Sequence, residues 1–321
     1  MAVAEYSGPL SQPGKLRNWL RGLASATALL AFALVVLGGV VRVTGSGLGC
    51  PDWPLCDGGI LPPLNTEALI EFSHRLVASA LLGPFVLATC IVVWVAYRRE
   101  RWLVVPATLA FVMMLVQALL GGITVLNELP GEIVAAHLAL GEALLGCLLL
   151  VLVVTFRGPL VLSGRTLVDG GSDRLPILAL ISAVGTFGVI MTGSYVTLSG
   201  ATTACLGWPL CDGKIFPETG LQMIHMAHRL ASAIIAILLA VTLYTGIRHN
   251  YGAPQLRTVS IGAAALFLGQ VLVGAATVWL KFPVELKALH LALATLVWGA
   301  MVALTALSYD RSGLSPEVAH A

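Results

Sequence analysis

The chain has 321 residues, of which 58% are hydrophobic and only 11% are charged, whereas an ordinary soluble domain carries about a quarter charged residues. With a mean hydropathy of +0.92, this composition excludes a soluble globular domain and predicts an integral membrane protein. The net charge of +2 is small and the basic residues are scattered, so nucleic acid is excluded as a partner and the lipid bilayer is the expected solvent.

Apolar stretches long enough to cross about 30 Å of hydrocarbon predict eight membrane-spanning helices. In chain order they cover residues 20–42, 74–97, 104–126, 134–156, 176–197, 224–247, 258–280 and 286–307. A β-barrel would instead show short segments of alternating hydrophobicity, and the run EALLGCLLLVLVVTF, which starts at Glu142, is apolar almost all round. The predicted class is therefore an all-α integral membrane protein.

Lysine and arginine residues predict the orientation. The segments before the first span and after the second, fourth and sixth are basic, with Lys15, Arg17, Arg21, Arg98, Arg99, Arg101, Arg157, Arg165, Arg174, Arg248 and Arg257. The long loops after the first and fifth spans contain only Lys214, although Lys281 and Lys287 mildly oppose this asymmetry. Because cytoplasmic loops are enriched in Lys and Arg, we expect a plasma-membrane protein with both termini in the cytoplasm and the long loops outside. The first span lacks a small-residue cleavage site and is read as retained.

Two stretches of the chain repeat each other. The run WPLCDG occurs twice, and Cys50 and Cys205 are 155 positions apart. Further along, His74 and His228 are 154 positions apart, and His137 and His290 are 153 apart. A duplicated four-helix unit explains these offsets. Because each unit has an even number of spans, both copies share one orientation, as in parallel repeats.

We therefore predict two tandem four-helix bundles, related by a pseudo-two-fold axis along the membrane normal. The N-terminal half covers residues 20–157 and the C-terminal half covers 176–307. A cytoplasmic N-terminal segment (1–19), a cytoplasmic linker (158–175) and a cytoplasmic tail (308–321) complete the predicted organisation.

Four histidines occupy equivalent places at the outer ends of the even-numbered spans: His74, His137, His228 and His290. A polar or ionisable side chain at membrane depth is costly and is a functional hypothesis by default. Two imidazoles on facing helices are a typical way for a helix bundle to hold haem iron. The sequence therefore predicts one haem-sized site in each half. The alternative is that each histidine only forms a hydrogen bond with a neighbouring helix. The occurrence of four histidines at equivalent positions of the two repeats argues against this alternative.

Zinc is the competing metal, but zinc sites gather three or four ligands at short spacings, and this sequence shows no such cluster. His225 and His228 share one helical face, so a small-metal site there stays open. His249 and His320 fall in a basic loop and in the tail, where surface positions are expected.

The halves differ beside the histidines. Glu71 lies one turn before His74, whereas the position before His228 is held by His225. A carboxylate next to a haem can hold protons or stabilise developing positive charge, so one half is predicted to do chemistry that the other does not. The alternative is a carboxylate favoured by the dipole of the helix N-terminus.

An arginine follows the histidine in each copy, at Arg75 and Arg229. These guanidinium groups are candidates for haem propionate contacts, or they lie at the headgroup boundary.

The cysteines fall into two kinds. Cys50/Cys56 and Cys205/Cys211 form C-x5-C pairs in the outer loops, where disulfides persist, and each pair is predicted to close its loop. A structural role is the default, and a redox-active pair is the alternative. Cys90 and Cys147 are single residues within apolar spans, with no chemistry assigned. Glycines recur in the odd-numbered spans, where they allow close helix approach or leave room for a macrocycle.

Several features together resemble the haem A synthase family. They are the duplicated eight-helix plan, the Glu-x-x-His-Arg run from Glu71 to Arg75, the His-Arg pair at His228, and the WPLCDG cysteine pairs. The resemblance extends over residues 21–307. A single His-Arg pair is a weak signal, but the joint order in both halves is specific.

The resemblance implies an oxidoreductase that converts the methyl group of haem O to the formyl group of haem A in two successive steps, for terminal oxidase assembly. It implies a haem b cofactor whose iron is bound by His228 and His290. It further implies that haem O, the substrate, binds at His74 and His137, with Glu71 as the catalytic carboxylate. The partners that the resemblance suggests are haem O synthase and an electron acceptor, and the oligomeric state stays open. The presence of a cysteine pair in each half resembles the bacterial branch of the family.

Two other classes of membrane protein fit the sequence less well. A di-haem cytochrome b that only transfers electrons would hold its haems near opposite membrane faces, whereas these histidines share one side. A transporter with parallel repeats would show charges near the bilayer midplane or broken helices, and the sequence is interpreted as having neither.

Overall fold

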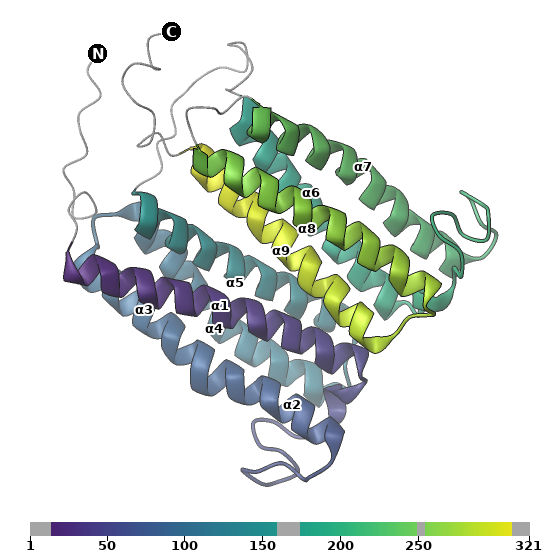
Figure 1. Ribbon diagram of the computed structural model, residues 1–321. Coiled ribbons are helices and arrows are strands. Elements are labelled where there is room, and N and C mark those ends of the chain that lie inside the picture. Colours follow the sequence, from purple (N-terminus) through teal and green to yellow (C-terminus); the bar gives the residue numbers. More distant parts are fainter. Residues whose placement is uncertain (1–13, 159–173, 249–253, 310–321) are drawn as a thin grey trace.

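The computed structural model describes residues 14–158, 174–248 and 254–309, and this part of the chain is a helical bundle (Figure 1). Eight of its helical segments are long and apolar enough to cross a membrane, which confirms the predicted all-α class and the eight spans. The helices are α1 (Lys15–Val43), α2 (Thr66–Leu76), α3 (Gly83–Ala96), α4 (Arg101–Leu126), α5 (Gly131–Arg157), α6 (Leu175–Leu198), α7 (Gly220–Arg248), α8 (Pro254–Trp279) and α9 (Val284–Ser308). The second span runs through α2, a π-helical segment η2 (Val77–Leu82) and α3 without a break.

Equivalent helices pack in equivalent ways in the two halves. In the first half α5 packs against α1 and α4, and in the second half α9 packs against α6 and α8. The halves meet where α9 contacts α1 and α5, and they lie side by side in Figure 1. Their relation by an axis along the membrane normal stays a prediction, as do the exact bounds of the halves and the side of the membrane on which each end lies.

Buried hydroxyl pairs tie equivalent helices together in both halves. Thr27 Oγ1 in α1 lies 3.0 Å from Thr89 Oγ1 in α3. At the corresponding place Ser182 Oγ in α6 lies 2.8 Å from Thr242 Oγ1 in α7. All four side chains are buried. These pairs therefore join the first and second spans of each half at equivalent places.

Every span begins before the residue that the hydropathy pattern predicts, and the second span does so by the largest margin. The second span begins at Thr66, eight residues before its predicted start, and the sixth begins at Gly220, four residues before its predicted start, because these first residues are too polar to register as membrane-spanning. Asn65 caps α2, since its side-chain oxygen accepts a hydrogen bond from the amide of Ala68 at 2.8 Å, and such a cap is a helix-start signal. His74 therefore lies eight residues after the first residue of this span, in the last turn of α2.

The π-helical segment η2 marks a one-residue difference between the halves. The runs RLVASALL at Arg75 and RLASAII at Arg229 match when one residue, Val77, is left out. At this place the chain forms six residues of π-helix, and the amide of Gly83 donates to the carbonyl of Ala78, five residues back. A π turn accommodates an extra residue without breaking the helix, so the second span stays continuous.

One prediction about charge inside the spans is wrong. Glu142 lies near the middle of α5 and is fully buried, although no charged side chain was expected at the centre of a span. Its Oε1 accepts a hydrogen bond of 2.6 Å from the hydroxyl of Thr295 in α9. The surrounding run of leucine and valine masks a single carboxyl in any hydropathy average.

Candidate functional site

Each of the four predicted histidines lies against a glycine on the preceding span of its own half. A Cβ added to the glycine would lie 3.1, 3.3, 3.1 and 2.9 Å from the nearest ring carbon in the pairs His74–Gly38, His137–Gly121, His228–Gly193 and His290–Gly274. Such contacts are tighter than side chains tolerate without moving. These glycines therefore make room for the imidazole rings, a role that differs from the close helix approach and the space for a macrocycle that the sequence suggested. In the fourth span, Gly146 leaves room in the same way for the ring of Trp298 across the interface between the halves.

The histidines come together as two pairs, one in each half. His74 and His137 lie within electrostatic reach of each other, and so do His228 and His290. All four lie at the end of the bundle that carries the cysteine loops, His74 and His228 eight residues and His137 and His290 six residues into their helices. The predicted pairing within each half matches this arrangement.

Two glutamines that the sequence analysis missed stand beside the second histidine of each pair. Gln117 donates from Nε2 to the backbone carbonyl of His137 at 3.0 Å, and Gln270 Nε2 lies 3.4 Å from His290 Nε2. Both Oε1 atoms are buried without a hydrogen-bond partner. The two glutamines are 153 positions apart, the same offset as the histidines beside them, so the repeat alignment holds a signal that could have found them.

The residues of each half fit a haem better than a small metal ion. The Nδ1 atoms of His74, His137 and His290 are buried and have no hydrogen-bond partner, while the rings keep part of their surface exposed. Within the described residues, no three side chains of the kinds that bind metal ions come together. Two neutral imidazoles from different helices, each set against a glycine, form the donor set that haem iron takes in helix bundles.

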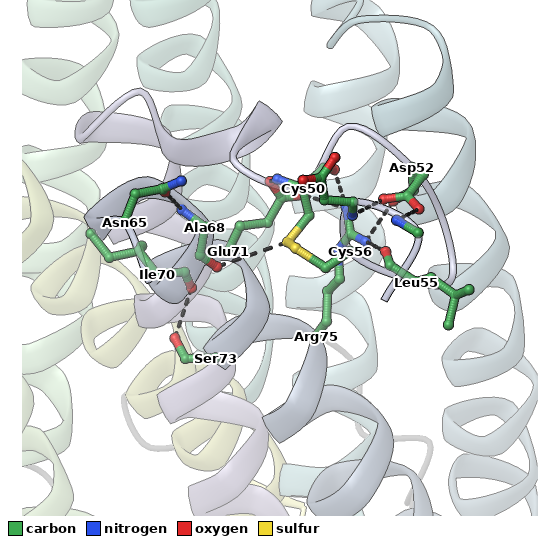
Figure 2. The surroundings of a disulfide bond; sticks show 12 residues. Cys50, Asp52, Leu55, Cys56, Asn65, Ala68, Ile70, Glu71, Ser73 and Arg75 are labelled. Carbon is green, nitrogen blue, oxygen red and sulfur yellow. Dashed lines mark hydrogen bonds and ion pairs between the residues drawn. A yellow bond between two sulfur atoms is a disulfide. The ribbon is translucent and has the colours of Figure 1, made fainter. Parts of the chain in front are cut away.

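Glu71 and Arg75 tie α2 to the first cysteine loop (Figure 2). Glu71 is 4% exposed, and its Oε2 accepts a hydrogen bond of 2.8 Å from the amide of Cys50. Its Oε1 accepts one of 2.5 Å from Arg75 Nη2. The same guanidinium donates to the carbonyls of Cys50, Asp52 and Leu55. The carboxylate is thus paired with a cation and fixed next to the loop.

The second half repeats this connection with a different partner. Arg229 donates to the carbonyl of Gly207 at 2.6 Å, and its Nη2 lies 3.3 Å from Nε2 of His225. His225 Nδ1 lies 3.0 Å from the carbonyl oxygen of Ala201. A carbonyl oxygen only accepts hydrogen bonds, so Nδ1 carries the proton and Nε2 accepts from Arg229. His225 is neutral in this arrangement, and both of its nitrogens are used.

Both predicted disulfides are present. Cys50 is bonded to Cys56 and Cys205 to Cys211, whereas Cys90 and Cys147 are free. Each bridge closes a short loop that its arginine holds against the following helix. The choice between a structural and a redox-active pair stays open, and so does the prediction that Arg75 and Arg229 contact haem propionates. His249 and His320 lie outside the described residues.

A carboxylate organises the first loop only. The side chain of Asp52 accepts hydrogen bonds from the amides of Asp57 at 2.6 Å and Gly58 at 2.8 Å. The amide of Gly58, together with that of Asp57, holds the pKa of the Asp52 carboxyl below its usual value. The position corresponding to Asp52 in the second loop is Gly207. The first loop is therefore held by an additional anion that the second one lacks.

Comparison with known proteins places these features in a family. A family described as cytochrome oxidase assembly protein matches residues 21–302, a stretch that begins in α1 and ends in α9. This chain belongs to that family. The cytochrome oxidase assembly proteins that it resembles include the haem A synthase of Geobacillus kaustophilus, 30% identical over 289 residues, which are 89% of this chain and 90% of that protein.

A second relative in the cytochrome oxidase assembly protein family supports the same placement. The haem A synthase of Symbiobacterium thermophilum is 33% identical over 290 residues, which are 88% of this chain and 93% of that protein. The family match covers both halves, so it includes both histidine pairs and both cysteine loops. The name of these relatives associates the family with haem, in agreement with the donor set described above.

Proposed function

We propose that this protein is a haem A synthase, an oxidoreductase that converts the methyl group of haem O to the formyl group of haem A. The observation that supports the proposal most is the duplicated pair of imidazoles with a carboxylate in one copy only. Two equivalent haem-sized sites with unequal surroundings suit a protein that modifies one haem with the help of another. The family membership and the names of its relatives agree with this assignment.

The balance of the reaction requires an electron acceptor. With water as the oxygen source, –CH3 + H2O gives –CHO + 4 H+ + 4 e−, and each of the two successive steps removes two electrons and two protons. The acceptor is a membrane quinone or a redox partner protein. The finished haem would serve assembly of a terminal oxidase, and haem O synthase is the partner that would supply the substrate.

The N-terminal half is the proposed substrate site, where His74 and His137 hold haem O. Glu71 lies one turn from His74 and is the proposed catalytic carboxylate. A fixed carboxylate in a dry site stabilises positive charge that develops on the reacting carbon, and it accepts protons as they leave. Arg75 and Cys50 keep it oriented, because the guanidinium of Arg75 holds Oε1 while the amide of Cys50 holds Oε2.

The C-terminal half is the proposed site of a resident haem b, held by His228 and His290. When bound, haem b supplies one-electron transfer between the substrate site and the acceptor. His225 stands where the other half has Glu71, and its two nitrogens are engaged by Ala201 and Arg229. No carboxylate therefore stands at the position equivalent to Glu71, and this half is proposed to carry electrons and not to oxidise a methyl group.

The competing assignment is a di-haem electron-transfer protein. Such a protein would place its haems at different depths to move electrons across the bilayer. Here both histidine pairs lie at the same end of the bundle, which disfavours transfer across the membrane. The proposed location is the plasma membrane, with both termini in the cytoplasm and the two disulfide loops on the outer, oxidising side.

Haem extraction tests the proposed function. The protein is purified from cells that make haem O, its haems are extracted and they are separated by chromatography. The wild type is expected to yield haem b together with haem O and haem A, and Glu71→Ala is expected to yield haem b and haem O without haem A. Haem b alone from the wild type, with no conversion in cells supplied with haem O, would contradict the synthase assignment.

The division between the halves has its own test. His228→Ala is expected to lose stable haem b, whereas His74→Ala is expected to keep haem b and to lose conversion. Equal loss of haem b in both variants would show that the halves are not specialised in this way. Haem content per protein, measured by the pyridine haemochrome spectrum, separates the two outcomes.

A further inference from the structure

A threonine hydroxyl stands behind one of the four histidines. Thr192 Oγ1 in α6 lies 2.8 Å from Nδ1 of His228, and it donates its own proton to the carbonyl of Val189 at 2.8 Å. Because a hydroxyl has only one proton to give, its oxygen accepts the hydrogen bond from His228. The proton of this imidazole therefore sits on Nδ1, and the lone pair of Nε2 is left free for a metal.

The other half lacks this hydroxyl. The position equivalent to Thr192 is Leu37, at the same offset of 155 positions that relates Cys50 to Cys205. His74 packs against Gly38 as His228 packs against Gly193, but its buried Nδ1 has no hydrogen-bond partner. The two sites thus share the position and the packing of this histidine, and they differ in whether a hydroxyl forms a hydrogen bond with its Nδ1.

An acceptor behind a metal-binding imidazole has known physical effects. It fixes the tautomer and the orientation of the ring, and it makes the other nitrogen a stronger donor. Loss of such a partner typically weakens metal binding by about 10–100-fold. His228 is consequently the better prepared iron ligand of the two, while no hydrogen bond holds Nδ1 of His74.

We propose that Thr192 is a positioning residue that makes His228 a long-lived ligand of the resident haem, and that Leu37 leaves His74 as an exchangeable one. The inference rests on the proposed function, in which one haem stays and the other enters and leaves in each cycle. A substrate site must release its product, so a weaker ligand suits it. A cofactor site must retain its haem, so a histidine held by a hydrogen bond suits it.

Haem dissociation from the purified, haem-loaded protein tests the inference. The rate of haem b loss to excess apomyoglobin is expected to rise about tenfold in Thr192→Val and to stay near wild type in Thr192→Ser, which keeps the hydroxyl. The midpoint potential of haem b is expected to rise in Thr192→Val, because a less basic imidazole stabilises ferric iron less. Thr186→Val is the matched control, since its hydroxyl donates to the Ser182 carbonyl within the same helix.

The reciprocal variant adds the missing hydroxyl to the other half. Leu37→Thr is expected to increase the haem O and haem A that copurify with the protein and to slow their release, without weakening haem b. An unchanged haem b dissociation rate and potential in Thr192→Val, or unchanged retention of haem O and haem A in Leu37→Thr, would overturn the inference. Retention of haem b by His228→Ala would instead overturn the proposed assignment of the halves, so the two failures are distinguishable.

Discussion

The two halves hold their disulfide loops with the same arginine but with different partners beside it. In the first half Arg75 pairs with the carboxylate of Glu71, and in the second half Arg229 meets the neutral imidazole of His225. Both arrangements tie a helix to the loop that precedes it. The second half therefore shows that this connection does not need a carboxylate, which leaves the charge of Glu71 available for the chemistry proposed for the first half.

Replacing Glu71 with histidine and His225 with glutamate should give the largest effect on the conversion of haem O. Glu71→His is expected to lower conversion of haem O by about 100-fold or more, the usual contribution of a positioned acid or base, while the loop stays tied. His225→Glu is expected to leave conversion close to the wild-type rate. Haem A formed in whole cells, normalised to haem b in the purified protein, measures both.

Thermal unfolding and limited proteolysis of the same variants provide the control. Both exchanges should leave the melting temperature and the protection of the loops near the wild type. Equal loss of haem A in the two exchanges, with both proteins folded, would show that the carboxylate of Glu71 has no special part and would break the comparison.

The glycines behind the histidines should give the next largest effect. Gly193→Ala is expected to weaken haem b binding by about tenfold, because overpacking of a close contact costs ~1–3 kcal/mol. Gly188→Ala on the same helix is the matched control, since a Cβ there meets nothing within 4 Å. In the other half Gly38→Ala should leave haem b in place and lower conversion. A normal haem b content in Gly193→Ala would argue against the fit of the imidazole pair to haem.

Removal of one disulfide should have a moderate effect. In a structural pair, Cys50→Ser together with Cys56→Ser is expected to cost about 2 kcal/mol of stability, as estimated for a short closed loop, and to leave most of the conversion at low temperature. The melting temperature and the haem A yield are the measurements. Complete loss of conversion with an unchanged melting temperature would favour the redox-active alternative, and the pair Cys205/Cys211 offers the same test in the other half.

Acidic pH is expected to change the protease sensitivity of the two loops differently, and this should be the smallest of the expected effects. The folded pKa of Asp52 is lowered, so its contribution to stability is fully present above the unfolded value of about 3.9 and is lost as the pH falls through the folded value. Protease sensitivity of the first loop should therefore rise at strongly acidic pH, and that of the second, which has Gly207 at this position, should not. Asp52→Asn should make the first loop sensitive already at neutral pH. Equal acid sensitivity of both loops would contradict this account.

The sequence predicts those features that depend on composition and local spacing. The eight spans follow from runs of apolar residues that must satisfy every backbone group in lipid, and the disulfides join cysteines only six positions apart. The pairing of His74 with His137 could be predicted because the duplication supplies the same pair twice. The start of α2 could also have been found, since Asn65 followed by a helical stretch is a capping signal.

Side-chain partners from distant helices could not be predicted. Thr192 lies in an apolar run 36 positions before His228, and nothing local indicates that its hydroxyl faces that ring. Glu142 meets a residue 153 positions away, and its burial depends on how the halves pack. The π-helical segment η2 depends on one extra residue, Val77, which is visible only when the halves are aligned with a gap.

The contact between Glu142 and Thr295 has a consequence for the ancestry of the chain. The two residues are separated by 153 positions, as are His137 and His290, so they occupy one position of the repeated unit and meet each other between the halves. In a dimer of identical units, this position would face its own copy. Two buried carboxyls would then have to share a proton, or two hydroxyls would meet. A carboxyl opposite a hydroxyl requires two units of different sequence, so this pair dates from after the duplication, when the two copies had begun to diverge.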